Sequence, residues 1–203
     1  MQQSNSYNNN HLSVPLILHI YELKPNVEDP RQLSSTDRAL CMVSGFLPSI
    51  GMGAYHSSLE VFDLIYTFSN AGVMVSRKGQ QEAGVPAGGT YKQNIRLAEL
   101  RNVTKAQLPQ VIQRLSTLFY TPHGSYNYVH RNCNHFTETL ATALIIMEQP
   151  HQNYKDSARL QTYPKWLNRL ANTGAMVGVT GSSSGIAATP SQILNEAKVA
   201  AGL

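Results

Sequence analysis

The chain has 203 residues, 42% of them hydrophobic, and its 16 basic and 12 acidic side chains give a net charge of +4. This length allows one domain with its own core, whereas two domains are not expected. The basic residues are spread along the chain, so no nucleic-acid partner is predicted. No apolar run of about 18 residues and no signal sequence is present, which predicts a cytoplasmic protein, with access to the nucleus, that does not insert into membranes.

The first part of the chain is predicted to form three strands after a disordered start. Residues 1–13 are rich in Asn, Gln and Ser, which is typical of disorder. Val14–Leu23 is apolar and partly β-branched, as in a central strand. Residues 53–62 alternate between two faces, and a turn at Asp63–Leu64 would lead into a return strand over 65–68.

A loop, a short strand and a helix are expected next. Glycines and a proline indicate a loop over 76–90, and a short strand is predicted over 94–97. Thr104 and Gln107 match a capping box. The helix behind it carries apolar residues at helical spacing up to Phe119.

A second helix is predicted to begin at Cys133, with Asn132 as its N-cap. Its buried stripe would consist of Phe136, Leu140, Ala143, Leu144 and Met147. A short third helix should start at Pro164. Residues 173–203 are rich in Gly, Ser and Ala and are expected to be a flexible tail, with a weak signal for a brief amphipathic helix over 189–199.

Cys133 is the candidate nucleophile. A thiol on the first turn of a helix feels the partial positive charge of the unpaired amides, so a low pKa is predicted. The alternative is a buried, unreactive cysteine. Cys41, the other cysteine, lacks this context, and an intracellular compartment would keep both as thiols.

His56 is the candidate partner of this thiol. It lies on the more polar face of the predicted strand over 53–62. A histidine near a cysteine can take up the thiol proton and later protonate the leaving group. Papain-like folds bring a sheet histidine against a helix-borne cysteine. Here the histidine precedes the cysteine, so such a fold would have to be circularly permuted.

Other groups could complete the site. Backbone amides at the helix start can bind an oxyanion, and Asn132 or Asn134 could add a side-chain donor, although capping alone explains Asn132. No residue is evident that must orient the histidine. Asp63 and Asn70 are its neighbours in sequence.

A zinc site is the main chemical alternative. His123, His130, Cys133 and His135 lie close together in sequence. Their spacing contains neither a Cys-x-x-Cys pair nor paired histidines four residues apart, so no metal or other cofactor is predicted. His19 on the first strand is interpreted as a core or edge histidine.

Three blocks of the sequence resemble one family. Residues 53–62 read GAYHSSLEVF, residues 126–138 read YNYVHRNCNHFTE, and residues 164–171 read PKWLNRLA. The first two resemble the histidine and cysteine blocks of the PPPDE superfamily of permuted papain-fold peptidases. The third resembles a segment of the second subgroup of desumoylating isopeptidases.

The resemblance implies an α+β domain over residues 14–172. This domain would have a circularly permuted papain-like fold, with a small antiparallel sheet or barrel packed against helices and the catalytic cysteine at a helix N-terminus. The resemblance assigns His56 as the catalytic histidine and Cys133 as the nucleophile. It implies an isopeptidase that removes SUMO or ubiquitin from lysine side chains of a conjugated protein, and it is compatible with a homodimer.

The modifier stays open because the sequence departs from the family after the hairpin. Residues 68–72 read FSNAG where relatives carry a glycine sooner, and the loop over 76–90 matches no family pattern. Two other functions also remain open. One is a thioesterase that removes acyl groups from protein cysteines, and the other is a non-catalytic binding module.

Overall fold

The computed structural model covers the core of the chain and leaves several segments outside it. The described residues are 13–23, 55–80, 85, 89–127, 131–149, 163–168 and 189–203. Of the start predicted to be disordered, residues 1–13, all but residue 13 lie outside the described residues, as does Cys41.

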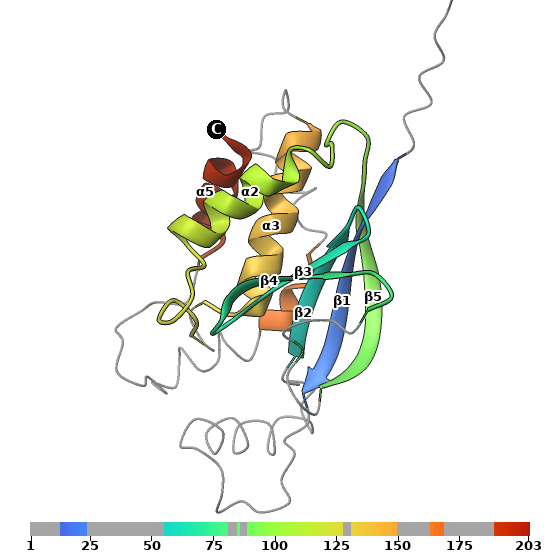
Figure 1. Ribbon diagram of the computed structural model, residues 1–203, viewed down its shortest axis with the longest axis vertical. Helices are drawn as coiled ribbons and strands as arrows, with labels where there is room; N and C mark the ends of the chain where they lie inside the picture. Colours follow the sequence, from blue (N-terminus) through green and yellow to red (C-terminus); the bar gives the residue numbers. More distant parts are fainter. Residues whose placement is uncertain are drawn as a thin grey trace, which may run out of the picture.

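Five strands of the described chain form one antiparallel sheet, in the order β4-β3-β2-β1-β5 (Figure 1). Their bounds are β1 Val14–Leu23, β2 Tyr55–Val61, β3 Leu64–Ser69, β4 Gly72–Arg77 and β5 Gly89–Leu100. The predicted first strand and the predicted hairpin are confirmed, but the hairpin turn lies at Phe62–Asp63 and not at Asp63–Leu64. β4 was not predicted, and only its last two residues fall in the loop expected over 76–90. β5 is longer than the predicted strand over 94–97 because it follows β1 along its whole length.

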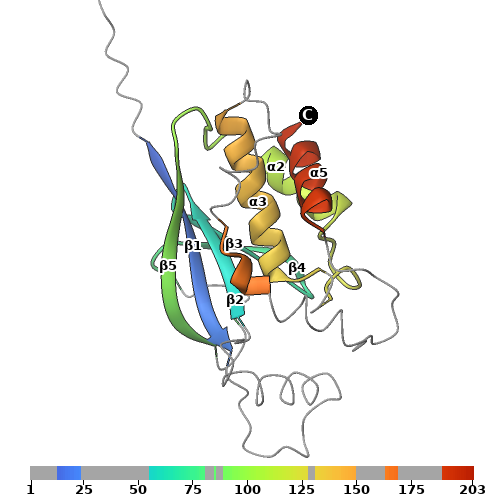
Figure 2. The ribbon, with the colours of Figure 1, turned by 180° about the vertical axis from the view of Figure 1, so that it is seen from behind.

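The helices lie on one side of the sheet, with α3 against the sheet and α2 and α5 on the far side of α3 (Figures 1 and 2). Their bounds are α2 Leu108–Leu118, α3 Cys133–Glu148, the 3₁₀ helix η4 Lys165–Asn168 and α5 Pro190–Ala201. The predicted α+β class is confirmed. Among the described helices, none is both long enough and apolar enough to cross a bilayer.

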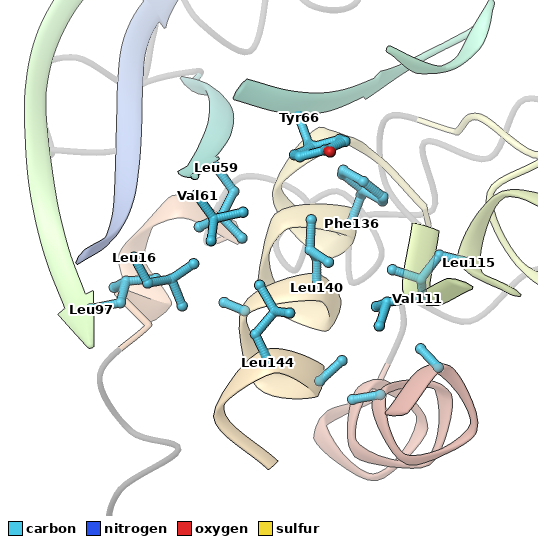
Figure 3. Close-up of a cluster of buried hydrophobic side chains, with 14 of the residues drawn as sticks. Leu16, Leu59, Val61, Tyr66, Leu97, Val111, Leu115, Phe136, Leu140 and Leu144 are labelled. Carbon is cyan, nitrogen blue, oxygen red and sulfur yellow. The ribbon is translucent and has the colours of Figure 1, made fainter. Parts of the chain in front are cut away.

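The core forms between the inner face of the sheet and α3. Alternate residues of β1, Leu16, Leu18 and Ile20, are buried in it. Figure 3 shows Phe136, Leu140 and Leu144 of α3 in the same cluster. Residues labelled in this cluster include Leu16, Leu59, Val61, Leu97, Phe136, Leu140 and Leu144. Because α2 and α5 cover its other side, α3 is buried on most of its circumference, which fits its largely apolar sequence.

The hairpin between β2 and β3 turns on two residues that are not glycine. Phe62 and Asp63 have φ values of 52° and 62°, and Val61 pairs with Leu64 across the turn. This is the geometry of a two-residue hairpin turn whose twist matches that of the strands. The missing glycine costs roughly 1 kcal/mol per left-handed residue.

α2 begins later than the capping-box motif predicts. The Gln107 side chain accepts the Thr104 backbone N–H at 2.7 Å, but Gln107 itself is the N-cap and has no side-chain cap. Residues 105–107 form a turn, and the helix starts at Leu108 with Pro109 in its first turn, where a proline needs no hydrogen-bond partner.

The expectation of a flexible tail over residues 173–203 is wrong for residues 189–203. Thr189 caps α5 through a complete capping box with Gln192. Ile193, Ala197 and Ala200 are buried against the other helices. The weak amphipathic pattern was therefore a better guide than the Gly- and Ser-rich composition around it. The helix is stable because its apolar side packs against the core.

The packing of α5 can be tested by truncating its buried side chain. Ile193 is 6% exposed, so Ile193→Ala should lower the free energy of unfolding by about 2–4 kcal/mol. Leu203→Ala, at a residue 67% exposed, should change it by less than about 0.5 kcal/mol. Urea denaturation measures both. Equal, negligible effects would mean that α5 does not pack on the domain.

Candidate active site

Cys133 is the first residue of α3, as predicted, and a complete capping box fixes this helix start. The Asn132 side-chain oxygen accepts the His135 backbone N–H at 3.1 Å, and the Asn132 backbone N–H donates to His135 Nδ1 at 3.2 Å. The capping role of Asn132 is therefore confirmed.

A buried hydrogen-bond network attaches the start of α3 to β2. Ser57 Oγ donates to Asn134 Oδ1 at 2.7 Å and lies 2.7 Å from Thr137 Oγ1. Asn134 Nδ2 donates to the carbonyl oxygens of Tyr55 and Leu167, each at 3.2 Å. Both amide hydrogens of Asn134 are therefore used for positioning, and this side chain is not the oxyanion donor that the sequence suggested.

Tyr163, just before η4 in the sequence, belongs to the same hydrogen-bond network. Its hydroxyl donates to the Asn134 carbonyl oxygen at 2.9 Å and lies 2.7 Å from Thr137 Oγ1. The ring is buried, and burial raises the pKa of this phenol well above its usual range. Figures 1 and 2 show η4 beside the N-terminal end of α3, where these contacts form.

The edge of β2 is open next to the thiol. The β2–β3 ladder ends at the pair Leu59 and Tyr66. Beyond it, Thr67 Oγ1 donates to the Ser57 carbonyl oxygen at 2.9 Å in place of a backbone partner. The N–H of a strand residue points to the same side as its C=O, and the Ser57 N–H donates to the sulfur of Cys133. The thiol therefore lies at the gap where β3 leaves β2.

His56 approaches the same strand edge. It is only 2% exposed, although it lies on the polar face of β2 with Ser58 and Glu60, which are also buried. Its Nε2 lies 3.2 Å from Thr67 Oγ1, and its ring centroid lies 6.1 Å from that of Tyr21. Burial lowers the pKa of His56 to about 4, so the imidazole is neutral at physiological pH.

The predicted low pKa of Cys133 is wrong for this state. The residue is 3% exposed, and burial raises the pKa of its thiol. Hydrogen bonds from the backbone N–H groups of Ser57 and Asn134 and from the Tyr126 hydroxyl oppose the shift but do not reverse it. In the described part of the chain, no direct hydrogen bond joins Cys133 to His56. The thiol instead donates to Asn134 Oδ1 at 3.8 Å and accepts from the backbone N–H of Ser57, the residue that follows the histidine.

His19 belongs to a separate cluster on β1 and β2. Its Nε2 lies 2.8 Å from Glu60 Oε2, and Lys78 Nζ donates to Glu60 Oε1 at 2.6 Å. The hydrogen bonds to Lys78 and His19 hold the pKa of the Glu60 carboxyl below its usual range despite burial. The interpretation of His19 as a partnered structural histidine fits this contact.

The residues of the alternative zinc site have different surroundings. His135 uses Nδ1 in the capping box of α3. His123 is exposed in a turn, where its backbone N–H donates to the Asn70 carbonyl oxygen at 3.0 Å. His130 lies outside the described residues.

Three residues that contact His56, Cys133 or the start of α3 were not predicted from the sequence. His56 is bound by Thr67 rather than by its sequence neighbours Asp63 or Asn70. Tyr126 contacts the thiol, and Tyr163 supports the start of α3. A threonine in a strand carries no signal of its own. Tyr126 could have been singled out because it opens the cysteine block.

Comparison with known proteins identifies a family and two relatives. The family described as "PPPDE putative peptidase domain" matches residues 14–183. A DeSI-like protein of Arabidopsis thaliana is 24% identical over 162 residues, covering 79% of this chain and 57% of the relative. A desumoylating isopeptidase 1 homolog of Caenorhabditis elegans is 27% identical over 139 residues, covering 66% of this chain and 36% of the relative. The chain thus spans only part of both relatives.

Removing the Asn134 side chain tests the network. Asn134→Ala removes the acceptor of the Ser57 hydroxyl and the donor to two backbone carbonyls, so the free energy of unfolding should fall by about 2–4 kcal/mol. Asn94→Ala removes an exposed asparagine that donates to Tyr91, and it should cost less than about 1 kcal/mol. Chemical denaturation compares the two. A loss at residue 134 as small as that at residue 94 would contradict the network.

The neutral state of His56 predicts acid sensitivity. The unfolded chain binds the proton with the ordinary pKa of 6.5, whereas the folded protein binds it only near pH 4. Stability is therefore complete above pH 6.5 and falls as the pH drops towards 4, by up to about 3 kcal/mol from this residue. His56→Gln should lose this part of the pH dependence.

The comparison between the two proteins isolates the histidine. Glu138, whose pKa burial raises to about 7, acts in the opposite direction, but both proteins keep it. Unfolding free energies measured from pH 7.5 to 4.5 give the difference. Parallel curves for wild type and His56→Gln would show that the histidine is not neutral and buried.

Proposed function

This chain belongs to the PPPDE peptidase family, and on that basis we propose that it is a cysteine isopeptidase that releases a ubiquitin-like modifier from lysine side chains. Cys133 is the proposed nucleophile and His56 the proposed general base. The fold supports this assignment, because it is the α+β, permuted papain-like architecture in which a sheet histidine and a helix-borne cysteine act together.

The observation that carries the proposal is the position of the thiol. Cys133 begins α3 and accepts a hydrogen bond from the backbone of Ser57, the residue next to His56. Two segments far apart in sequence thus bring a thiol and an imidazole to one strand edge. The Asn134–Ser57 contact at 2.7 Å maintains this register.

The proposed reaction starts from a neutral pair. As the thiol attacks the isopeptide carbonyl carbon, its proton passes to His56, and an S–C bond forms. The backbone N–H of Cys133, at the positive end of the α3 dipole, stabilises the oxyanion. Collapse breaks the C–N bond, and the imidazolium gives its proton to the departing lysine amine.

Hydrolysis completes the cycle. Neutral His56 accepts a proton from a water molecule that attacks the thioester, and the imidazolium then protonates the leaving thiolate. The products are the free modifier carboxylate and the regenerated thiol. Catalytic hydrogen bonds are often longer in an enzyme without substrate than in its substrate complex. The lack of a direct hydrogen bond between the two side chains is therefore compatible with this route.

SUMO is the proposed modifier. The support is the name of the Caenorhabditis elegans relative, a desumoylating isopeptidase homolog. Ubiquitin is the alternative that the test must separate, since the described residues include no assigned modifier groove.

Labelling with modifier probes tests the proposal. SUMO and ubiquitin that carry a C-terminal electrophile should form a covalent adduct with wild type, and SUMO should react faster. Cys133→Ala should abolish the adduct, and His56→Gln should slow it by roughly 100-fold or more because the base is lost. Intact-mass spectrometry measures the yield.

Cys41→Ser is the matched control, because the chain has two cysteines and this variant keeps the proposed nucleophile. It should label as fast as wild type. If no probe reacts while iodoacetamide still alkylates Cys133, the isopeptidase proposal fails and a non-catalytic binding module becomes the better assignment. If the ubiquitin probe labels the protein faster than the SUMO probe, ubiquitin replaces SUMO as the proposed modifier.

A further inference from the structure

We propose that Thr67 is a positioning residue that fixes the tautomer of His56, with the proton on Nε2 and Nδ1 left free to accept the thiol proton. This inference rests on the proposed function for its catalytic meaning. Its structural part, the tautomer, stands on the hydrogen bonds alone.

The proton count at the Thr67 hydroxyl determines the tautomer. A hydroxyl has one hydrogen, and a carbonyl oxygen can only accept. Thr67 Oγ1 lies 2.9 Å from the Ser57 carbonyl oxygen, so its hydrogen is committed there. His56 Nε2, at 3.2 Å from the same hydroxyl, must then donate. In a neutral imidazole the other nitrogen is therefore an acceptor.

Burial makes the alternative arrangement costly. Thr67 is 2% exposed, Ser57 is fully buried, and His56 is nearly so. If Thr67 donated to His56 instead, the Ser57 carbonyl would lose its Thr67 donor at the point where the β3 backbone no longer pairs with it. A buried carbonyl that loses its donor is destabilising, so the arrangement that keeps the Ser57 carbonyl paired is favoured.

The same hydrogen bond persists through the proposed proton transfer. When Nδ1 takes up a proton, Nε2 remains a donor, so the contact with Thr67 keeps its direction in both charge states. The ring is thus held while only Nδ1 changes. Thr67 adds no negative charge, which agrees with the low pKa of His56 that burial produces. Its contribution is orientation and tautomer choice.

The position of Thr67 follows from the sheet. Tyr66 and Phe68 point into the core, so Thr67 between them points to the other face, the face that carries His56. Its hydroxyl replaces the backbone partner that Ser57 lacks beyond the end of the ladder. One side chain thereby completes the strand edge and orients the histidine.

Nuclear magnetic resonance reads the tautomer directly. Two-bond ¹⁵N–¹H correlations of the His56 imidazole at pH 7 should show a protonated Nε2 and an unprotonated Nδ1 in wild type and in Thr67→Ser. Thr67→Val, which keeps the shape and removes the hydroxyl, should shift the ring to a mixture of tautomers or to Nδ1–H.

This readout separates the two proposals. It needs no substrate, so a protein that fails to react with any modifier probe can still have the expected tautomer. A wild-type spectrum with the proton on Nδ1 overturns the inference whether or not the variants fold. An unchanged tautomer in folded Thr67→Val overturns it as well.

The rate of probe labelling tests whether the tautomer of His56 affects the reaction. Thr67→Val should slow adduct formation on the order of 10-fold or more because part of the population carries the wrong tautomer, and Thr67→Ser should restore most of the rate. Thr142→Val is the control, since it removes another buried threonine hydroxyl, nine positions beyond Cys133 on α3. Equal rates for Thr67→Val and wild type would contradict the positioning role.

Discussion

The hydrogen bond between Ser57 and Asn134 is the constraint on which the rest of the site depends. It joins two elements through a fully buried hydroxyl and a buried amide. Because Asn134 also donates to the carbonyls of Tyr55 and Leu167, one side chain sets the distances among β2, α3 and η4. A satisfied buried network of this kind has one low-energy geometry, since any slip of the helix would leave several polar groups unpaired. The position of the Cys133 sulfur relative to the β2 backbone follows from that geometry.

Burial shifts the pKa values of Cys133 and His56 in opposite directions, but both shifts favour the uncharged side chain. It raises the pKa of the Cys133 thiol and lowers that of His56, so it favours the uncharged form of each. The resting site is therefore a thiol beside a neutral imidazole and not a preformed ion pair. The helix start and the Ser57 amide still favour the thiolate once it forms. A thiol in this state resists oxidation better than an exposed thiolate would.

The sequence predicted the local features of the site and missed those that depend on the sheet. The N-cap at Asn132 and the helix start at Cys133 were predicted correctly because capping is a short-range preference, and the alternation over residues 53–62 identified β2. The depressed thiol pKa was wrong because burial is a tertiary property. Thr67 could not be found, since its role arises only where β3 separates from β2. The helix over 190–201 was underestimated because its stability comes from packing.

The distance along the chain between the interacting groups has a consequence for biosynthesis. Ser57 and Asn134 are 77 positions apart, and Asn134 also needs the carbonyl of Leu167. These contacts are non-local, so they form late in folding and only after residues 57, 134 and 167 have all emerged from the ribosome. A nascent or partly folded chain therefore lacks the assembled pair of thiol and imidazole. The proposed activity would therefore begin only once these long-range contacts have formed.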